Sequence, residues 1–324
     1  MRIKNIAILT SGGDAPGMNA SIRAVVRTSM AKDITVIGFM RGYNGLIHDT
    51  HIALQRFSVS NIIQRGGTIL GTARSAEFET EKGMAQAFKT MKKNKIDALI
   101  VIGGEGTMTG ADRFSKKYRI KVIGLPGTID NDLFGTDFTI GFDTAVNNAV
   151  HAVDQIRDTA SSLERLFFIE VMGRYSGHIG LAVGLSGGAE DVLIPETPTD
   201  IKALAASLNN NIKKGKKSNI IIVSEGDEAG NALEIANKIK KILKEEYRVA
   251  VLGYIQRGGS PTANDRILAS KLGYHAVMGL LKGKSRYMVG EINKKIVFTP
   301  LKETYTKKKK IDISDYNLIH TLAQ

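Results

Sequence analysis

The chain has 324 residues, 43% of them hydrophobic and 24% charged, so it can bury a large core, and its length favours two domains over one. It contains no cysteine, which excludes disulfides, thiolate catalysis and cysteine metal sites. Its formal net charge of +13 favours anionic partners.

Short β-rich runs alternate with helical patterns along most of the chain. The predicted strands span 5–10, 34–39, 97–103, 121–126, 165–172, 191–196, 219–225 and 249–255. Several of them lack a regular alternation of polar and apolar residues, which is typical of parallel strands buried on both faces. Amphipathic stretches predict helices at 142–161, 201–214 and 230–246. This order predicts an α/β fold in which helices cover both faces of a parallel sheet.

The apolar run at 5–10 breaks at the sequence SGG and is too short for the core of a signal peptide. No apolar segment reaches the length of a membrane-spanning helix. We therefore expect a cytoplasmic protein that does not associate with membranes.

Two glycine-rich turns follow predicted strands and open helical stretches: SGGDAPGMNA at 11–20 and GGEGTMTG at 103–110. Glycine lets backbone N–H groups approach a phosphate closely, and a helix N-terminus adds partial positive charge. A single turn of this kind needs glycine for its shape alone, whereas two predict a phosphate site. Neither turn matches a Walker A loop or the G-x-G-x-x-G pattern, which disfavours a Rossmann dinucleotide site.

Arginine stands beside glycine in three further turns, GTAR at 71–74, MGR at 172–174 and IQRGGSP at 255–261. The planar arginine fork suits phosphate oxygens, so these turns indicate a ligand with more than one phosphate. LPGTIDND at 125–132 places Asp130 and Asp132 just after a strand, where open α/β sheets bind ligands. Arginines around a carboxylate turn favour phosphoryl transfer.

Taken together, the motifs resemble the ATP-dependent 6-phosphofructokinases. TSGGDAPGMNA, the GGxGT turn, PGTIDND, GTDFTIGFDTA, EVMGR and GYIQRGGSP occur in the order of that family between about residues 3 and 300. The resemblance implies two three-layer αβα domains with mainly parallel sheets. A nucleotide-binding domain would comprise 1–140 plus 256–306, and a sugar-phosphate-binding domain 141–255 plus 307–324. The implied reaction is Mg²⁺-dependent phosphorylation of fructose 6-phosphate by ATP at the 1-hydroxyl, the committed step of glycolysis.

The resemblance also implies roles for individual residues. The catalytic residues would be Asp130, Thr128, Arg74 and Arg174. Asp130 would act as the general base toward the 1-hydroxyl, and Thr128 would contact the transferred phosphoryl group. Glu105 and Asp132 would hold the metal. The nucleotide would contact Gly13, Arg74, Ser75, Gly104, Glu105, Gly106 and Thr107.

The implied sugar-phosphate contacts are Thr128, Ile129, Asp130, Arg165, Met172, Gly173, Arg174, Glu225, Arg248, Tyr254 and Arg257. In the family, the arginines matching Arg165 and Arg248 reach in from a neighbouring subunit, so we expect a homotetramer. An effector pocket between subunits, which binds ADP or phosphoenolpyruvate in the family, matches Arg23, Arg27, Arg56, Arg157, Gly188, Glu190, Lys214, Lys216 and Lys217. Taken alone, Arg23 and Arg27 would be interpreted as an exposed basic pair on a helix.

The chain departs from the family pattern at a few positions. Glu105 replaces an aspartate associated with magnesium; it keeps the oxygen ligands but places them one methylene further out. Tyr254 stands where a sugar-contacting histidine is common, and tyrosine cannot become cationic near neutral pH. Ser75 and Glu79 replace an aromatic residue and an arginine near the base, which weakens the expected preference for adenine.

Other functions remain open at this level. Pyrophosphate-dependent phosphofructokinases typically carry Asp and Lys where this chain has Gly106 and Gly127, which favours ATP. The GGxGT turn alone also fits an NAD kinase or a lipid kinase, and a non-catalytic phosphometabolite sensor would have lost Asp130. Net charge alone permits nucleic-acid binding, but no DNA- or RNA-reading motif occurs, and we expect none. We expect the lysine run at 307–310 to be a solvated turn.

Overall fold

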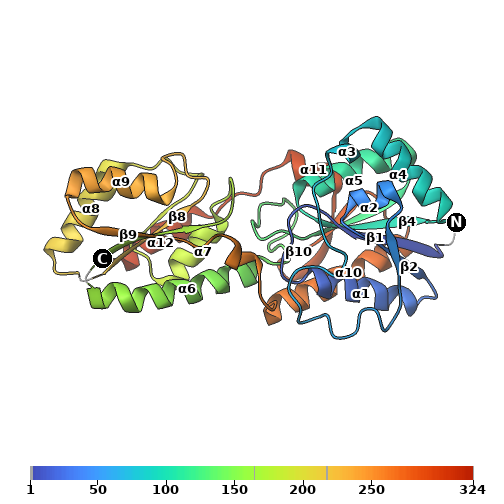
Figure 1. Ribbon diagram of the computed structural model, residues 1–324, viewed down its shortest axis with the longest axis horizontal. Coiled ribbons are helices and arrows are strands. Elements are labelled where there is room, and N and C mark those ends of the chain that lie inside the picture. The colour runs from blue at the N-terminus through green and yellow to red at the C-terminus, as the bar shows by residue number, and fades with distance from the viewer. Residues whose placement is uncertain (1–2, 164, 217, 324) are drawn as a thin grey trace. The chain divides into compact units, whose positions relative to one another are not determined.

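The computed structural model describes residues 3–163, 165–216 and 218–323 (Figure 1). The chain divides into two compact units. Unit 1 comprises Met1–Thr144 and Arg257–Lys309, and unit 2 comprises Ala145–Gln256 and Lys310–Gln324. Each unit is a layered α/β structure around a mainly parallel sheet, which confirms the predicted fold class.

Unit 1 is built on a seven-stranded sheet with the order β11-β10-β5-β4-β1-β2-β3. Its strands are β1 (Asn5–Thr10), β2 (Thr35–Phe39), β3 (His51–Leu54), β4 (Ala98–Gly103), β5 (Lys121–Pro126), β10 (Tyr287–Ile292) and β11 (Lys295–Pro300). The inner strands are parallel, and β3 and β11 close the two edges in antiparallel pairs. Every residue of β4 is buried, as expected for a central strand covered on both faces.

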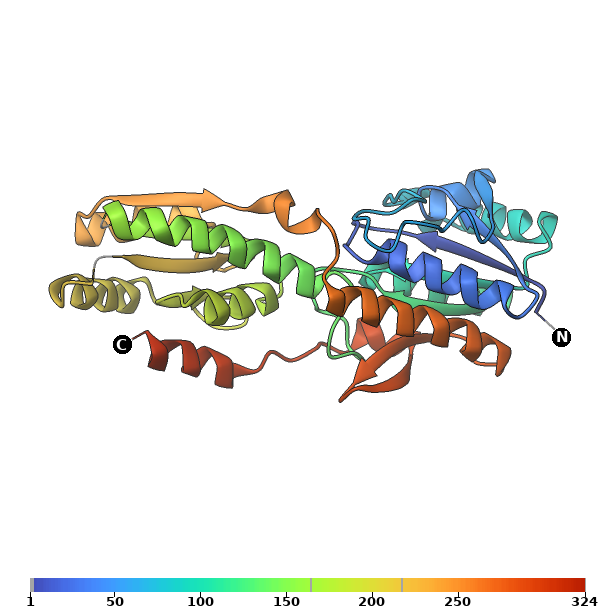
Figure 2. The ribbon, with the colours of Figure 1, turned by 90° about the horizontal axis from the view of Figure 1, so that it is seen from below.

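Helices cover both faces of this sheet. In Figures 1 and 2, α1 (Met18–Met30) and α10 (Ala263–Leu281) lie side by side on one face. The other face carries α2 (Tyr43–His48), α3 (Ala76–Glu79), α4 (Glu81–Lys93), α5 (Glu105–Tyr118) and α11 (Leu301–Thr306). Alternate strand residues pack into this second layer, Leu99 and Val101 of β4 among them, so the helices hold the strand ends in place.

Unit 2 contains a four-stranded parallel sheet with the order β7-β8-β6-β9. Its strands are β6 (Leu166–Val171), β7 (Asp191–Leu193), β8 (Asn219–Ser224) and β9 (Tyr247–Val251). Its helices are α6 (Phe142–Leu163), α7 (His178–Gly187), α8 (Ile201–Lys213), α9 (Ala232–Leu243) and α12 (Ile313–Leu322). The apolar faces of α8 and α9 pack on one side of the sheet. Within the described residues, no helix is long and apolar enough to cross a membrane.

The strand predicted at 249–255 was wrong at its carboxyl end. β9 stops at Val251, and a 3₁₀ helix, η1 (Gly253–Arg257), follows it. Gly253 adopts φ +50°, a left-handed conformation that a strand cannot continue through. The sequence also did not predict β3, β10 or β11; β3 and β11 are the antiparallel edge strands, and β10 lies between β11 and β5.

The buried carboxylate of Asp265 ties the start of α6 to α10. It accepts hydrogen bonds from the backbone N–H groups of Gly141 (2.7 Å) and Thr144 (2.8 Å). Burial raises the pKa of Asp265 to about 6, although these hydrogen bonds favour its charged form. The second half of the motif GTDFTIGFDTA therefore has a structural role, because Asp265 holds its backbone at Gly141 and Thr144.

Candidate active site

Three turns meet where β1, β4 and β5 end at one edge of the unit 1 sheet. The N–H of Ser11 donates to Ile102 O (3.0 Å), and the N–H of Gly127 donates to Gly103 O (3.0 Å). A Cβ on Gly104 would lie 3.7 Å from that of Thr128. Carboxyl ends of neighbouring parallel strands share an edge, which explains why turns distant in sequence become adjacent.

The turn after β4 needs glycine because the backbone of the turn after β1 comes very close. A Cβ on Gly103 would lie 2.4 Å from both Ser11 O and Thr107 Oγ1, and that hydroxyl donates to Ser11 O (3.1 Å). Glu105 and Gly106 begin α5 and are both exposed. The N-terminus of α5 is therefore accessible to solvent, and its partial positive charge suits an anion.

Arg74 is held beside the first glycine turn by its neighbours in the chain. The N–H of Gly12 donates to Ala73 O (3.2 Å), and the Thr72 hydroxyl donates to Gly12 O (2.9 Å). The Arg74 side chain is exposed. Ser75, predicted as a nucleotide contact, caps α3, and its hydroxyl accepts from Phe78 N–H (3.3 Å).

The turn that carries Asp130 is buried and tied down by its own segment. Asp130 is only 5% exposed, and its N–H donates to Thr128 Oγ1 (3.3 Å). The Thr139 hydroxyl donates to Thr128 O (2.6 Å). Asn131 adopts φ +52°, and its Oδ1 accepts from Thr139 N–H (2.9 Å). The side chain of Ile129 is fully buried in the core, so only its backbone is left for the predicted ligand contact.

Arg257 lies in unit 1, against the first glycine turn. Its Nη1 donates to Asp14 O (3.0 Å). A Cβ on Gly13 would lie 2.4 Å from the same Nη1, so this position accepts only glycine while Arg257 stays where it is. Arg257 thus brings a permanent positive charge to the turn that was predicted to bind phosphate.

In unit 2, the MGR turn and Glu225 meet where β6 and β8 end. The Arg174 N–H donates to Glu225 Oε1 (2.8 Å). A Cβ on Gly226 would lie 1.7 Å from Arg174 O, so the two loops are in main-chain contact. Gly173 adopts φ +145°, a conformation that favours glycine. Met172 is half-buried beside them, and Tyr254 on η1 is 82% exposed.

Arg165 and Arg248 lie at the opposite end of the unit 2 sheet. Arg165 directly precedes β6, and Arg248 pairs with Phe167 near the start of that strand. A strand of this length spans roughly 20 Å. Within the chain itself, these two arginines are therefore separated from the MGR turn by the length of the sheet.

Comparison with known proteins identifies the family to which the chain belongs. The family model described as Phosphofructokinase matches residues 5–280. The chain belongs to the phosphofructokinase family. The resemblance inferred from the motifs is thereby confirmed, and with it the class of enzyme.

The family relatives match the chain end to end. It is 54% identical over 321 residues to ATP-dependent 6-phosphofructokinase 1 of Thermus thermophilus, covering 99% of this chain and 100% of that protein. It is 49% identical over 331 residues to the ATP-dependent 6-phosphofructokinase of Halothermothrix orenii, covering 99% and 100%.

Solved phosphofructokinases share the fold of the chain. A phosphofructokinase structure from Saccharomyces cerevisiae matches with a TM-score of 0.90 and 34% identity. The match covers 99% of the present chain and 48% of the yeast chain. A pyrophosphate-dependent phosphofructokinase from Marinobacter aquaeolei has a TM-score of 0.85 and 26% identity, covering 96% and 86%. The fold is thus common to enzymes with different phosphoryl donors, so donor choice must depend on individual residues.

Glu105 and Asp132 are the predicted metal ligands of this phosphofructokinase family member. Among the described residues, no group of three or more His, Cys, Asp or Glu side chains could hold a metal ion by itself. Mg²⁺ is usually bound by one or two carboxylates together with substrate phosphates and water. One exposed and one half-buried carboxylate at adjoining turns fit that mode of binding.

Part of the predicted effector set comes together in unit 2. Arg157 Nη2 donates to Gly188 O (2.6 Å), and Lys216 Nζ lies 3.3 Å from Glu190 Oε1. Glu190 is buried, and Lys216 also donates to Ala323 O (2.8 Å). Lys214 is exposed at the end of α8.

The remaining members of that set lie elsewhere. Arg23 and Arg27 are on α1 of unit 1, where both are half-buried, so they are not the exposed pair that the sequence alone would suggest. Arg56 is exposed in the loop after β3, and Lys217 lies outside the described residues. Within each unit of one chain, the set is therefore incomplete.

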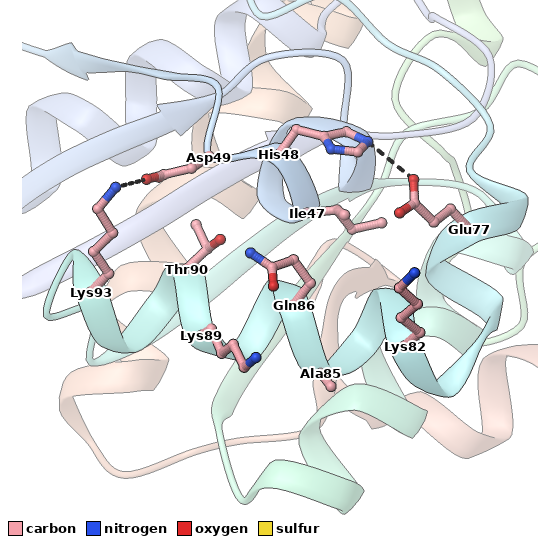
Figure 3. Close-up of a pocket in the computed structure, with 10 residues that line it drawn as sticks. All are labelled: Ile47, His48, Asp49, Glu77, Lys82, Ala85, Gln86, Lys89, Thr90 and Lys93. Atoms are coloured by element: carbon pink, nitrogen blue, oxygen red, sulfur yellow. Dashed lines mark hydrogen bonds and ion pairs between the residues drawn. The ribbon is translucent and has the colours of Figure 1, made fainter.

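A cavity of about 670 Å³ opens on the outer surface of unit 1, between α2 and α4 (Figure 3). Its lining includes Lys82, Lys89 and Lys93 of α4. His48 contacts Glu77 (3.0 Å), and Lys93 contacts Asp49 (2.8 Å), so much of the charge is paired. None of the predicted site residues lines this cavity.

The expectation of a solvated turn at 307–310 was wrong for one lysine. Lys309 is half-buried, and its Nζ donates to Asn131 Oδ1 (2.9 Å) in the Asp130 turn. Sequence reasoning missed this contact because 178 residues separate the two side chains. Nothing in the local sequence distinguishes Lys309 from the other three lysines of the run at 307–310.

Proposed function

We propose that the chain transfers the γ-phosphoryl group of ATP to the 1-hydroxyl of fructose 6-phosphate, giving ADP and fructose 1,6-bisphosphate in cytoplasmic glycolysis. The observation that carries the proposal is the buried Asp130 turn adjoining the glycine turn at the start of α5. Identity of 54% over 321 residues to an enzyme named for the ATP-dependent reaction supports it. Formation of fructose 1,6-bisphosphate from these two substrates is the test.

In this reaction Asp130 accepts the proton of the 1-hydroxyl as its oxygen attacks the γ-phosphorus. The backbone N–H groups of Gly13, Gly104, Glu105 and Gly106 hold the nucleotide phosphates, with Thr107 and Ser75 nearby. Thr128 contacts the transferred group, and the Arg74 and Arg174 guanidinium groups offset the charge that develops on it. When bound, Mg²⁺ held by Glu105 and Asp132 would neutralise phosphate charge. Catalysis is then mainly positioning and electrostatics, as is usual for phosphoryl transfer.

The choice of ATP over pyrophosphate depends on two glycines. At Gly127, a Cβ would lie 2.8 Å from Ile102 Cγ2 and 3.0 Å from Met18 Cε, so a lysine cannot enter without repacking. At Gly106, a Cβ would meet nothing within 4 Å. The open space beside Gly106 leaves room for the α-phosphate of a nucleotide, which pyrophosphate lacks.

Sugar-phosphate binding is assigned mainly to unit 2, and nucleotide binding to unit 1. Met172, Gly173, Arg174 and Glu225 hold the sugar phosphate, together with Tyr254 and Arg257. Arg165 and Arg248 lie a sheet length away from the MGR turn, which supports the idea that they serve the site of a neighbouring subunit. The active form is then a homotetramer whose sites are completed by Arg165 and Arg248 of the partner subunit.

An effector site for ADP or phosphoenolpyruvate is part of this proposal. Arg157, Gly188, Glu190, Lys214 and Lys216 would form its part in unit 2. Lys217, which is outside the described residues, belongs to the same proposed set. Arg23, Arg27 and Arg56 would complete it from unit 1 of a neighbouring subunit. Because the basic members outnumber the single carboxylate, the pocket would attract a phosphorylated anion.

Mixing two impaired variants, assayed at a fructose 6-phosphate concentration near the wild-type KM, tests the shared site. Arg248→Ala should raise the KM for fructose 6-phosphate while leaving ATP binding unchanged, because the glycine turns lie within one chain. An Arg248→Ala subunit still supplies a sound Asp130, and an Asp130→Asn subunit still supplies a sound Arg248. Subunit exchange between the two should therefore rebuild complete sites and restore part of the wild-type turnover.

The control for this experiment is each variant exchanged with itself, which should gain no activity. Lys240→Ala, an exposed basic residue outside the proposed set, should behave as wild type. Mixed oligomers that form, as judged by native mass spectrometry, but remain inactive would rule out the shared site.

A further inference from the structure

Lys309 differs from the rest of the lysine run in where its charge lies. Lys307, Lys308 and Lys310 are exposed, whereas Lys309 is half-buried. Removing an ammonium group from water is costly, so a lysine is seldom withdrawn from solvent without specific partners. Its neighbours therefore indicate what it does.

The preceding residues place Lys309 along the segment that follows Asp132. Lys308 forms an antiparallel bridge with Leu133. The Nζ of Lys307 lies 5.1 Å from the ring centroid of Phe134, in a cation–π contact. Two successive contacts to residues 133 and 134 thus bring the next side chain to the Asp130 turn.

There, the Lys309 ammonium donates to Asn131 Oδ1 (2.9 Å) and to the backbone oxygen of Asp137. Asn131 is 3% exposed, and its Nδ2 donates to the same backbone oxygen (3.3 Å). Its Oδ1 also accepts from Thr139 N–H. The Asn131 carboxamide thus connects the turn to residues 137–139. Lys309 hydrogen-bonds to both partners of this connection, the Asn131 side chain and the Asp137 backbone oxygen.

The backbone of Asn131 needs this support. It adopts φ +52°, a left-handed conformation that costs energy for residues other than glycine, although asparagine tolerates it best. Because Asn131 stands between Asp130 and Asp132, any relaxation at this residue would turn both carboxylates. Burial lowers the pKa of Lys309 to about 8, and the nearby charges of Asp137 and Asp132 oppose that decrease.

We propose that Lys309 is a positioning residue for phosphoryl transfer, which holds the Asn131 side chain and so fixes the turn that carries Asp130 and Asp132. The inference depends on the proposed function of Asp130. Lys309 does not contact the substrate, and its effect on catalysis is transmitted through Asn131. A small displacement of reacting groups can cost about 100-fold in rate, which sets the scale of the expected effect.

The test uses the full-length enzyme and a double-mutant cycle. Lys309→Met keeps the length of the side chain but removes its charge and donors. Asn131→Gly removes the partner carboxamide while tolerating the left-handed backbone. The matched control is Lys308→Met, which makes the same change at an exposed neighbour whose contact to Leu133 is through the backbone.

Lys309→Met and Asn131→Gly should each lower kcat by about 10- to 100-fold, with both KM values within about threefold of wild type. The kcat of the double variant should be no lower than that of the less active single variant, because both changes remove the hydrogen bond between Lys309 and Asn131. Lys308→Met should match wild type, and thermal unfolding should show that each variant is folded.

Several results would overturn the inference. Turnover within twofold of wild type in folded Lys309→Met would do so, as would losses that multiply in the double variant. If Lys309→Met does not fold, Asn131→Gly decides alone, and normal turnover in that folded variant overturns the proposal. An inactive wild type would instead count against the proposed function, so the two failures are distinguishable.

Discussion

Replacing Asp130 by asparagine is expected to lower kcat by about 10²- to 10⁴-fold, the usual contribution of a general base. The substitution keeps the shape of the side chain but removes its ability to accept the proton of the sugar 1-hydroxyl. Because Asp130 is buried in a turn braced by Thr128 and Asn131, the backbone should not move. Steady-state kinetics should show both KM values nearly unchanged.

Asp33→Asn is the matched control for this variant. Asp33 is exposed and adopts φ +56°, a conformation that asparagine also tolerates, so the same chemical change should leave kcat unaltered there. Near-normal turnover in folded Asp130→Asn would remove the base from the mechanism. A large rise in KM for fructose 6-phosphate with kcat unchanged would instead make Asp130 a binding residue.

The second large effect is expected at Gly106, where an aspartate should weaken ATP binding by about 100-fold or more. The new carboxylate would face the nucleotide phosphates, and like charges placed together at a binding surface cost several kcal/mol. The fold should tolerate the change, because Gly106 is helical and exposed, and a Cβ there meets nothing within 4 Å. Calorimetry with a non-hydrolysable ATP analogue measures the loss directly.

Gly106→Asn separates repulsion from crowding, since it has the same shape as aspartate but no charge. We expect its affinity for the ATP analogue to lie between those of wild type and Gly106→Asp. Fructose 6-phosphate binding should be normal in both variants. If folded Gly106→Asp binds the analogue as tightly as wild type, the nucleotide does not lie at the 103–107 turn.

The sequence predicted the active-site edge of unit 1 well because its signals are local. Apolar runs such as β1 and β4 are buried on both faces and end in glycine turns, so strand, turn and helix start can be recognised within about a dozen residues. The adjacency of those turns follows from the order of parallel strands. The motifs themselves identified Asp130 as the residue to examine.

Features that depend on distant contacts could not be predicted. The β10–β11 hairpin turns at Asn293 and Lys294, which both have positive φ, but this pair lacks the glycine that usually marks such a turn. The end of β9 depends on Gly253, whose left-handed conformation does not show in an otherwise strand-like run. Lys309 reaches the turn of Asn131 only at the end of the second segment of unit 1, after the chain has passed through residues Ala145–Gln256 of unit 2.

The most direct test of the account compares ATP, GTP and pyrophosphate as donors to fructose 6-phosphate, with Mg²⁺ present, by following fructose 1,6-bisphosphate formation. We expect rapid product formation with ATP and none above background with pyrophosphate, whatever the rate with GTP. Product formation from pyrophosphate in preference to ATP would contradict the proposed function. So would a folded protein that forms no product with any of the three donors.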